Sequence, residues 1–204
     1  MSDEHPTASD HPATWKFGYP IHHPLTRAQW RSWLEDHHAT TKGMWLCSWK
    51  PATGRPAVPY VDAVLEALCF GWIDSTATTL DTERGLQLMT PRKAKSTWTR
   101  LNRRRVDELE AAGLMTEAGR RSVRIAQENG WWTILDPVED QIEPDDLAAA
   151  LDANPAARGA WDGFPASPRK AMLWWLISAV KPETRAARIA TIVAKAERNE
   201  RAQG

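Results

Sequence analysis

Several side chains in the middle of the chain could together recognise a small molecule. An indole can stack on a flat or cationic group, a guanidinium offers paired donors to an anion, and an amide matches an amide-like edge. The residues that could act in this way are Trp72, Asp74, Arg92, Trp98, Asn102 and Arg105. Residues expected at the rim of the same pocket are Tyr60, Trp45, Trp49 and Lys50. The set predicts a Trp-lined pocket for a polar, planar or anionic ligand.

Asp74 could also support a reaction in this pocket. A carboxylate beside tryptophan surface can have its pKa raised toward neutrality, which suits a general acid or base. Arg92, Asn102 and Arg105 would then stabilise developing negative charge. A structural alternative stays open, in which Asp74 and Arg105 form an ion pair that only fixes a helix against the sheet.

The helix expected over about 97–112 must position three of these residues. On a helical wheel of about 100° per residue, Arg105 lies about 20° and Asn102 about 40° from Trp98, on the inward apolar face. Burying a guanidinium without a partner costs on the order of several kcal/mol, so Arg105 needs an anionic partner. The carboxylates available are Asp74 and Asp81.

The surrounding elements indicate an α+β fold. We expect strands at 44–50, 73–80 and 86–90, where large apolar, β-branched and threonine residues gather between turn signals. A helix begins at Pro59, and its apolar positions Val61, Val64, Leu65, Leu68 and Trp72 form one stripe. Further helices are expected over 27–38, capped by Thr26, over 97–112, capped by Ser96 or Thr97, and to about 129, capped by Thr116. In the first of these, Arg31 and Glu35 are expected to pair four positions apart.

The domain organisation follows from these elements. We predict a flexible His/Pro-rich arm at 1–24, an α+β main domain at 25–135 with a small, mostly antiparallel sheet packed by helices, an acidic linker at 136–143 and a helical module at 144–200. In the last helix, Arg185 lies on an apolar seam. We expect an acidic partner there that joins the module to the main domain.

Two groups of motifs resemble one family. They are the run 66–74 (EALCFGWID), Thr90-Pro91-Arg92, Ser96-x-Trp98-x-x-x-Asn102, and the segments 168–170 (PRK) with Trp174 and 181–185 (KPETR) with Arg188-Ile189. Over about residues 26–199 the chain is similar to the YdeI/OmpD-associated bacteriocin-protection family. The resemblance implies a bacterial stress or resistance protein, with relatives linked to tolerance of cationic antimicrobial peptides. It implies no catalytic residues.

Composition excludes several classes of protein. Lys and Arg number 26 and Asp and Glu also 26, so no global charge favours nucleic acid or an anionic membrane. No apolar run approaches the roughly 18 residues of a membrane span, and residues 1–14 hold no apolar signal segment. We therefore expect a cytoplasmic protein with reduced thiols. Without a glycine-rich phosphate loop or dinucleotide fingerprint, we expect no cofactor.

Weaker signals leave other functions open. The pairs His22-His23 and His37-His38 could reach Cys47 or Cys69, but their spacing does not favour a metal site. Cys69 lies beside an apolar stripe, which favours a buried thiol over a nucleophile. Six arginines could track phosphates or form a solvated helix surface: Arg100, Arg103, Arg104, Arg120, Arg121 and Arg124. Tryptophans that remain exposed could form an interaction module or a homodimer surface.

Overall fold

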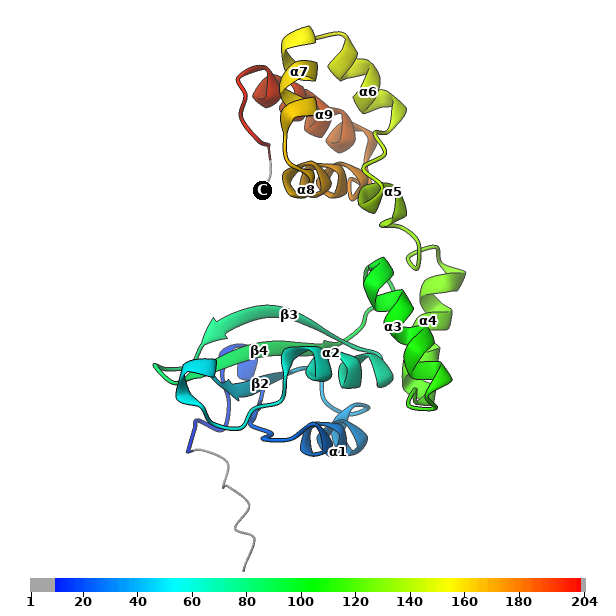
Figure 1. Ribbon diagram of the computed structural model, residues 1–204. Coiled ribbons are helices and arrows are strands. Elements are labelled where there is room, and N and C mark those ends of the chain that lie inside the picture. The colour runs from blue at the N-terminus through cyan, green and yellow to red at the C-terminus, as the bar shows by residue number, and fades with distance from the viewer. Residues whose placement is uncertain (1–9, 203–204) are drawn as a thin grey trace, which may run out of the picture. The chain divides into compact units, whose positions relative to one another are not determined.

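The computed structural model describes residues 10–202 and divides them into two compact units. The N-terminal unit extends to Trp132, and the C-terminal unit begins at Thr133. Each unit has its own buried apolar core, and each is described by itself. Figure 1 shows the elements of both units along the chain.

The N-terminal unit contains a four-stranded sheet in the order β1-β2-β4-β3. The strands are β1 (Ile21–His22), β2 (Met44–Trp49), β3 (Trp72–Thr79) and β4 (Arg84–Pro91). β4 pairs antiparallel with both β2 and β3, whereas the short β1 runs parallel to β2. A register shift interrupts β3 between Asp74 and Ala77. The sheet is therefore mostly antiparallel, as the sequence predicted.

One face of the sheet carries two helices, α1 (Arg27–His37) and α2 (Tyr60–Cys69) (Figure 1). Strand residues alternate between faces, so β2 and β4 turn Met44, Leu46 and Met89 toward these helices. Trp30 of α1 is fully buried, and its indole N–H donates to the Ala63 carbonyl at 3.0 Å. This contact joins α1 to α2 within the main core.

The opposite face is covered by the segment that we expected to be an irregular arm. Trp45 and Cys47 of β2 pack there with Ile21, and Tyr19 lies against the same cluster. The segment forms a single 3-10 turn, Lys16–Gly18, and then the strand β1. The prediction of a flexible arm is therefore wrong for its described part, because apolar residues of the sheet need a cover. The rest of that prediction, residues 1–9, lies outside the described residues.

Two further helices complete the N-terminal unit, α3 (Arg100–Ala111) and α4 (Glu117–Glu128). The cap of α3 is Thr99, whose hydroxyl accepts from the Asn102 N–H, rather than Ser96 or Thr97. Ser96 is unavailable because its hydroxyl accepts from the Lys93 N–H and closes the preceding turn. Caps at Thr26 and Thr116 are as expected.

The C-terminal unit is entirely helical in the residues described. Its helices are α5 (Asp136–Glu139), α6 (Asp145–Asp152), α7 (Pro155–Gly163), α8 (Ala166–Ile177) and α9 (Pro182–Glu197). Their core contains Leu147, Trp161 and Leu173. α5 occupies part of the segment expected to be a linker, and Val138 from α5 is buried in this core.

Arg185 has the acidic partner that its position on an apolar seam predicted. Its guanidinium makes two hydrogen bonds with Asp146, at 2.6 and 2.8 Å. Asp146 lies at the start of α6, so this pair joins two helices of the same unit rather than two domains. The two-pronged geometry fixes how α9 lies against α6. Between residues 10 and 202, no helix has the length and apolar character needed to cross a membrane.

Candidate functional site

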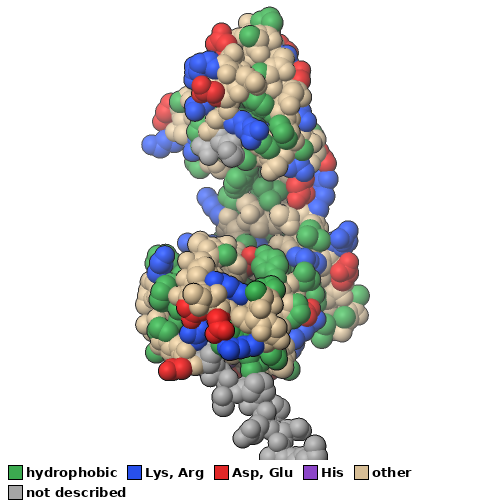
Figure 2. Space-filling model, turned by 60° about the vertical axis from the view of Figure 1, so that its left-hand side comes forward, with side chains coloured by type: hydrophobic (Ala, Val, Ile, Leu, Met, Phe, Trp, Pro, Cys, Tyr) green, Lys and Arg blue, Asp and Glu red, His purple; other side chains and the backbone are tan. Residues whose placement is uncertain are grey.

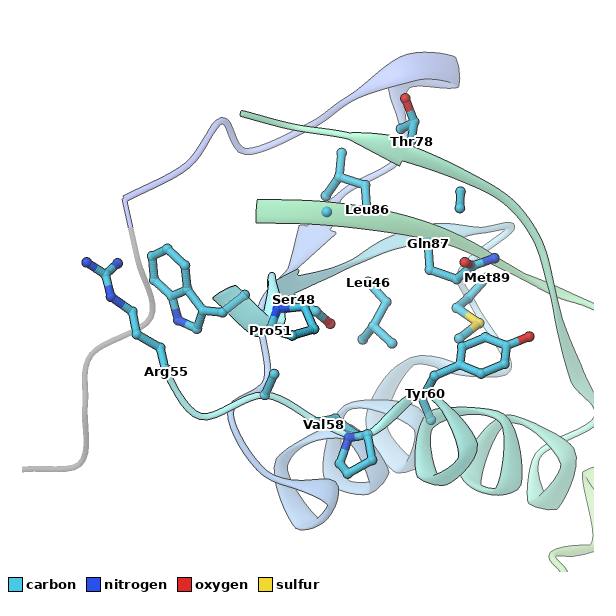
Figure 3. A pocket seen from close by; sticks show the side chains of 16 residues that line it. Leu46, Ser48, Pro51, Arg55, Val58, Tyr60, Thr78, Leu86, Gln87 and Met89 are labelled. Atoms are coloured by element: carbon cyan, nitrogen blue, oxygen red, sulfur yellow. The ribbon is translucent and has the colours of Figure 1, made fainter. Parts of the chain in front are cut away.

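A cavity of about 460 Å³ lies on the helical face of the sheet, at the N-terminal end of α2. α2 covers the middle of this face, but the ends of β2 and β4 extend past its first turn. Residues 50–59 cross over these strand ends (Figure 3). We call the space the sheet cavity and define it by Leu46, Ser48, Trp49, Arg55, Val58, Tyr60, Ala77, Gln87 and Met89.

The sequence of the covering segment explains why it stays extended over the cavity. Its first residues form a short 3-10 turn, Pro51–Thr53, which ends at Gly54 in the left-handed region with φ of 65°. Pro59 then stands one position before α2, where a helical hydrogen bond is not needed. Val58 is buried and anchors the segment to the core. These fixed points hold the segment above the strand ends without packing it onto them.

The walls of the sheet cavity are mainly apolar, with a few polar groups. Figure 3 shows Leu46 and Met89 below the strands, facing the space, whereas Thr78 and Leu86 point to the opposite side. Gln87 donates its amide N–H to the Ser75 carbonyl at 3.1 Å. The Ser48 hydroxyl has no hydrogen bond among the described residues, so its full capacity is available to a ligand.

A tryptophan and an arginine form one end of the cavity. The Arg55 guanidinium lies 4.2 Å from the centre of the Trp49 ring, within the range of a cation–π interaction. Arg55 also reaches Glu83 at 3.4 Å, and both of these side chains are about half exposed. This end therefore combines a flat aromatic surface with a solvent-accessible positive charge.

A tyrosine forms the other end, and an aspartate outside the cavity lining accepts its hydrogen bond. The Tyr60 hydroxyl donates to Oδ2 of Asp74 at 2.6 Å, and Asp74 lies opposite Met89 in the sheet register. The hydrogen bond with Asp74 raises the pKa of Tyr60 to about 12, and burial and the negative charge of Asp74 add to the effect. The positive charge of Arg105 acts on Tyr60 in the opposite direction.

Arg105 does not form the structural ion pair that was one interpretation of the sequence. Among the described residues no salt bridge joins it to Asp74. Its Nη1 donates instead to Oδ1 of Asn102 at 3.1 Å, one turn back on α3. Arg105 is half-buried, so water can hydrate its remaining donors. It therefore affects Tyr60 through its electric field rather than through a direct contact.

The other predicted site residues lie elsewhere. Trp72 and Trp98 are each 1% exposed and belong to the core, and Trp72 donates its indole N–H to the His38 carbonyl at 3.3 Å. Arg92 stacks on Trp98, with 3.6 Å between guanidinium carbon and ring centre, and borders a different hollow. Sequence reasoning grouped these three with Asp74 in one pocket, but the structure directs them inward or toward α4.

Trp45 and Lys50 also do not line the cavity. Trp45 lies on the opposite face of the sheet, where its indole N–H donates to the Lys16 carbonyl at 3.0 Å. Lys50 donates from Nζ to the carbonyl of Asp81 at 2.7 Å and so fixes the turn between β3 and β4. Alternation along β2 could have separated Trp45 from Leu46, since neighbouring strand residues face opposite sides.

Sequence reasoning missed several lining residues, among them Ser48, Arg55, Ala77 and Gln87. The alternation of β2 and the turn pattern of 51–56 were visible. Without the register of β2 on β4, however, nothing indicated that Ser48 and Gln87 would share a face with Leu46. The contact between Arg55 and Trp49 depends on how the covering segment returns over the sheet, which no short-range pattern specifies.

The histidines and cysteines were candidates for a metal site or a nucleophile. The part of the chain that the structure describes contains no group of three or more His, Cys, Asp or Glu side chains placed to hold a metal ion. His22 stacks on Trp33, with 5.7 Å between ring centres. Cys47 and Cys69 are both buried, and burial raises the thiol pKa of Cys47 to about 11 and also raises that of Cys69. Such thiols are poor nucleophiles.

Acidic residues offset much of the arginine-rich surface of α3 and α4. The ion pairs are Arg104–Glu108, Arg120–Glu110 and Arg124–Glu117. On the face of the N-terminal unit that Figure 2 shows, acidic and basic side chains are interspersed. This arrangement is typical of a solvated helix surface rather than a track for phosphates.

Comparison with known proteins separates the two units. Residues 22–122 match a family model described as a domain of unknown function (DUF8412). Residues 141–199 match the model described as bacteriocin-protection, YdeI or OmpD-associated. The C-terminal unit carries a YdeI/OmpD-associated domain. No curated protein and no solved structure matches the chain.

The YdeI/OmpD-associated match confirms the family suggested by the sequence motifs at 168–170 and 181–185. It does not extend over the motifs between residues 66 and 102, which lie in the segment that matches the other model. The sheet cavity therefore lies in the segment that matches the DUF8412 model, outside the YdeI/OmpD-associated match.

Proposed function

We propose that this YdeI/OmpD-associated protein is a bacterial stress or resistance protein that acts in the cytoplasm and binds a small ligand in its sheet cavity. The observation that carries the binding proposal is the cavity of about 460 Å³, bordered by Trp49 and Arg55 at one end and at the other by Tyr60, whose hydroxyl is hydrogen-bonded to Asp74. The ligand class is a flat, largely apolar molecule with a polar or anionic edge.

The size and chemistry of the sheet cavity support this ligand class. Pockets for small organic ligands usually enclose about 300–1,000 Å³ and have apolar walls with a few placed polar groups. Leu46, Val58 and Met89 supply apolar surface, Ser48 can hydrogen-bond, and Arg55 can attract an anionic edge. The cavity is thus lined by one tryptophan rather than by the several that the sequence suggested.

Binding can be tested with 8-anilinonaphthalene-1-sulfonate, a flat apolar anion that fluoresces when water is excluded from it. We expect one molecule to bind per chain. Replacing the exposed Ala77, which lines the cavity, by Phe should fill the space and weaken binding at least about tenfold, since it removes on the order of 1.4 kcal/mol of binding energy. Arg55→Gln should weaken it about two- to fivefold by removing one exposed charge interaction.

The matched control is Thr76→Phe, which places the same ring on an exposed position of the same strand that does not line the cavity and that neighbours Leu88 of the opposite face. It should leave the affinity unchanged. Equal weakening by Ala77→Phe and Thr76→Phe, or binding that neither affects, would show that the probe binds elsewhere.

A small-molecule enzyme that uses Asp74 as general base is the second candidate function. Asp74 is hydrogen-bonded to Tyr60 and lies opposite Met89 in the sheet, and both of these residues line the cavity. Its Oδ1 has no hydrogen bond among the described residues, so one carboxylate oxygen is available to a substrate proton. If this is correct, Asp74→Asn should keep ligand binding and lose turnover. Turnover that survives in Asp74→Asn would contradict it.

An interaction module built from exposed tryptophans has less support. None of the tryptophans from Trp15 to Trp98 is exposed. A homodimer stays a prediction, which native mass spectrometry of the purified chain would test together with any ligand carried from the cell.

A further inference from the structure

A second hollow of about 560 Å³ lies in the N-terminal unit, beside α4. It is bordered by the first half of α4, by the turn at Gly71 and by residues 91–94, and we call it the α4 hollow. Two hydrogen bonds fix its walls. The Arg92 N–H donates to the Gly71 carbonyl at 2.8 Å, and the Asn129 side chain donates to the Ala94 carbonyl at 2.7 Å.

The side chains that border the α4 hollow have an excess of positive charge. Arg92, Lys93 and Arg121 all line it, and none of the three forms a salt bridge with a described residue. The acidic residue at its wall, Glu117, is already paired with Arg124 at 2.5 Å. An anion that entered the hollow would therefore meet three cations and no uncommitted carboxylate.

Arg92 shows most clearly that a partner is missing. Its guanidinium is stacked 3.6 Å above the Trp98 ring, and its Nη1 donates to the Thr97 carbonyl at 2.9 Å. Its Nε is buried and has no acceptor in the described structure. Burial lowers the pKa of Arg92 to about 10, and the charge of Asp74 offsets this only from a distance greater than that of an ion pair.

We propose that the α4 hollow binds the phosphate group of a small phosphorylated molecule, held by Arg92, Lys93 and Arg121. A phosphate dianion offers oxygens in several directions and can accept from three cations at once, whereas a carboxylate offers two oxygens in one plane. The hollow is larger than a phosphate ion, which leaves room for the rest of the molecule. This site is separate from the sheet cavity, so neither proposal depends on the other.

The first test measures thermal stabilisation of the full chain by inorganic phosphate and by phenyl phosphate. Ligands that bind only the folded state raise the unfolding temperature according to their affinity. Both phosphates should stabilise the protein more than chloride or acetate at the same ionic strength. Stabilisation by acetate equal to that by phosphate would contradict a phosphate site, and stabilisation by chloride equal to both would show a salt effect only.

Single substitutions test whether phosphate binds in the α4 hollow. Lys93→Gln and Arg121→Gln should each weaken phosphate binding about fivefold, as expected for the loss of one charge-assisted contact at a partly exposed site. The matched control is Lys95→Gln, which removes the same charge from an exposed residue of the same loop that does not line the hollow. Equal weakening by Lys95→Gln and Lys93→Gln would overturn the proposal.

Arg92→Met distinguishes a binding residue from a structural one. Without phosphate, this variant should unfold at the same temperature as the parent or at a higher one, because it removes a buried charge that has no counter-charge. It should also lose the stabilisation by phosphate. A variant that is strongly destabilised in chloride, yet is stabilised by phosphate as much as the parent, would assign Arg92 a packing function and overturn its part in the site.

Discussion

The hydroxyl of Tyr60 and the carboxylate of Asp74 show how one residue sets the chemistry of another at the rim of the sheet cavity. The phenol donates to Asp74 at 2.6 Å, and ionising it would place two negative charges side by side. Tyr60 is therefore a hydrogen-bond donor across the physiological range rather than an acid. Asp74 in turn keeps its second oxygen, Oδ1, without a hydrogen bond among the described residues.

Asp74→Asn should lower the pKa of Tyr60 from about 12 toward its ordinary value of 10.0, because the neighbouring negative charge is removed. Ultraviolet titration of tyrosinate measures this directly, and Tyr60→Phe identifies which transition belongs to this residue. A Tyr60 pKa that stays near 12 in Asp74→Asn would show that burial, not the carboxylate, is the main cause.

His22 should make the stability of the fold depend on pH. Burial lowers its pKa to about 4, whereas in the unfolded chain it titrates near 6.5. Between these values the unfolded state binds more protons, so stability should fall as pH decreases from about 6.5 to 4 and be unaffected by His22 above that window. For a half-buried ring the loss is on the order of 2 kcal/mol.

Denaturant unfolding from pH 4 to 8 tests this, with His22→Phe as the comparison because a phenyl ring can keep the stacking on Trp33. The difference between the two stability curves should grow as the pH falls. Parallel curves would show that His22 remains accessible to protons in the folded protein.

At the scale of elements, a buried acid joins the first two helices. Glu66 of α2 is 2% exposed and accepts from Arg27 at 2.6 Å and from Arg31 at 2.8 Å, both on α1. The sequence predicted only the pair of Arg31 with Glu35 along α1, which is present at 3.2 Å. Glu66 and Arg27 lie far apart in the chain, so helical spacing could not indicate their contact.

Glu66→Gln should destabilise the protein by about 1–3 kcal/mol, since it leaves two arginines without their shared buried counter-charge, although both can be partly hydrated. Glu35→Gln removes the exposed partner of Arg31 and should cost about 0.3–0.5 kcal/mol. Chemical denaturation of both variants gives the comparison. Equal effects would mean that burial adds nothing to this network.

At the scale of the whole molecule, the chain divides into two units that match different family models. The N-terminal unit builds its core on both faces of a small sheet, and the C-terminal unit closes α5 to α9 around Leu147, Trp161 and Leu173. Each core is continuous within its unit, which is the property of a segment that can fold alone. The family matches fall on the two units in the same way.

Fragments 1–132 and 133–204 should therefore each fold when expressed separately. Circular dichroism should show that the C-terminal fragment is helical and unfolds cooperatively on heating, with modest stability, since a core of this size rarely contributes more than about 3–5 kcal/mol. The N-terminal fragment should keep binding of 8-anilinonaphthalene-1-sulfonate. A C-terminal fragment without a cooperative transition would show that it depends on the rest of the chain.

The sequence by itself determined where most helices and strands lie and which family model the C-terminal unit matches. Apolar periodicity predicted α2, turn residues bounded β2, β3 and β4, and threonines marked the start of α1 and α4, because all of these depend on neighbours within a few positions. Motifs in the last helices indicated the YdeI/OmpD-associated domain.

Only the tertiary structure decided which of the candidate site residues lie together. Helical and strand periodicity placed Trp98 and Arg105 inward, but it could not tell that Trp98 is covered by Arg92 while Arg105 donates to Asn102 on its own helix. That outcome depends on the register of β4 against both its neighbours and on the path of residues 50–59 over the sheet. Contacts between distant segments are set by packing the whole core, which no local spacing encodes.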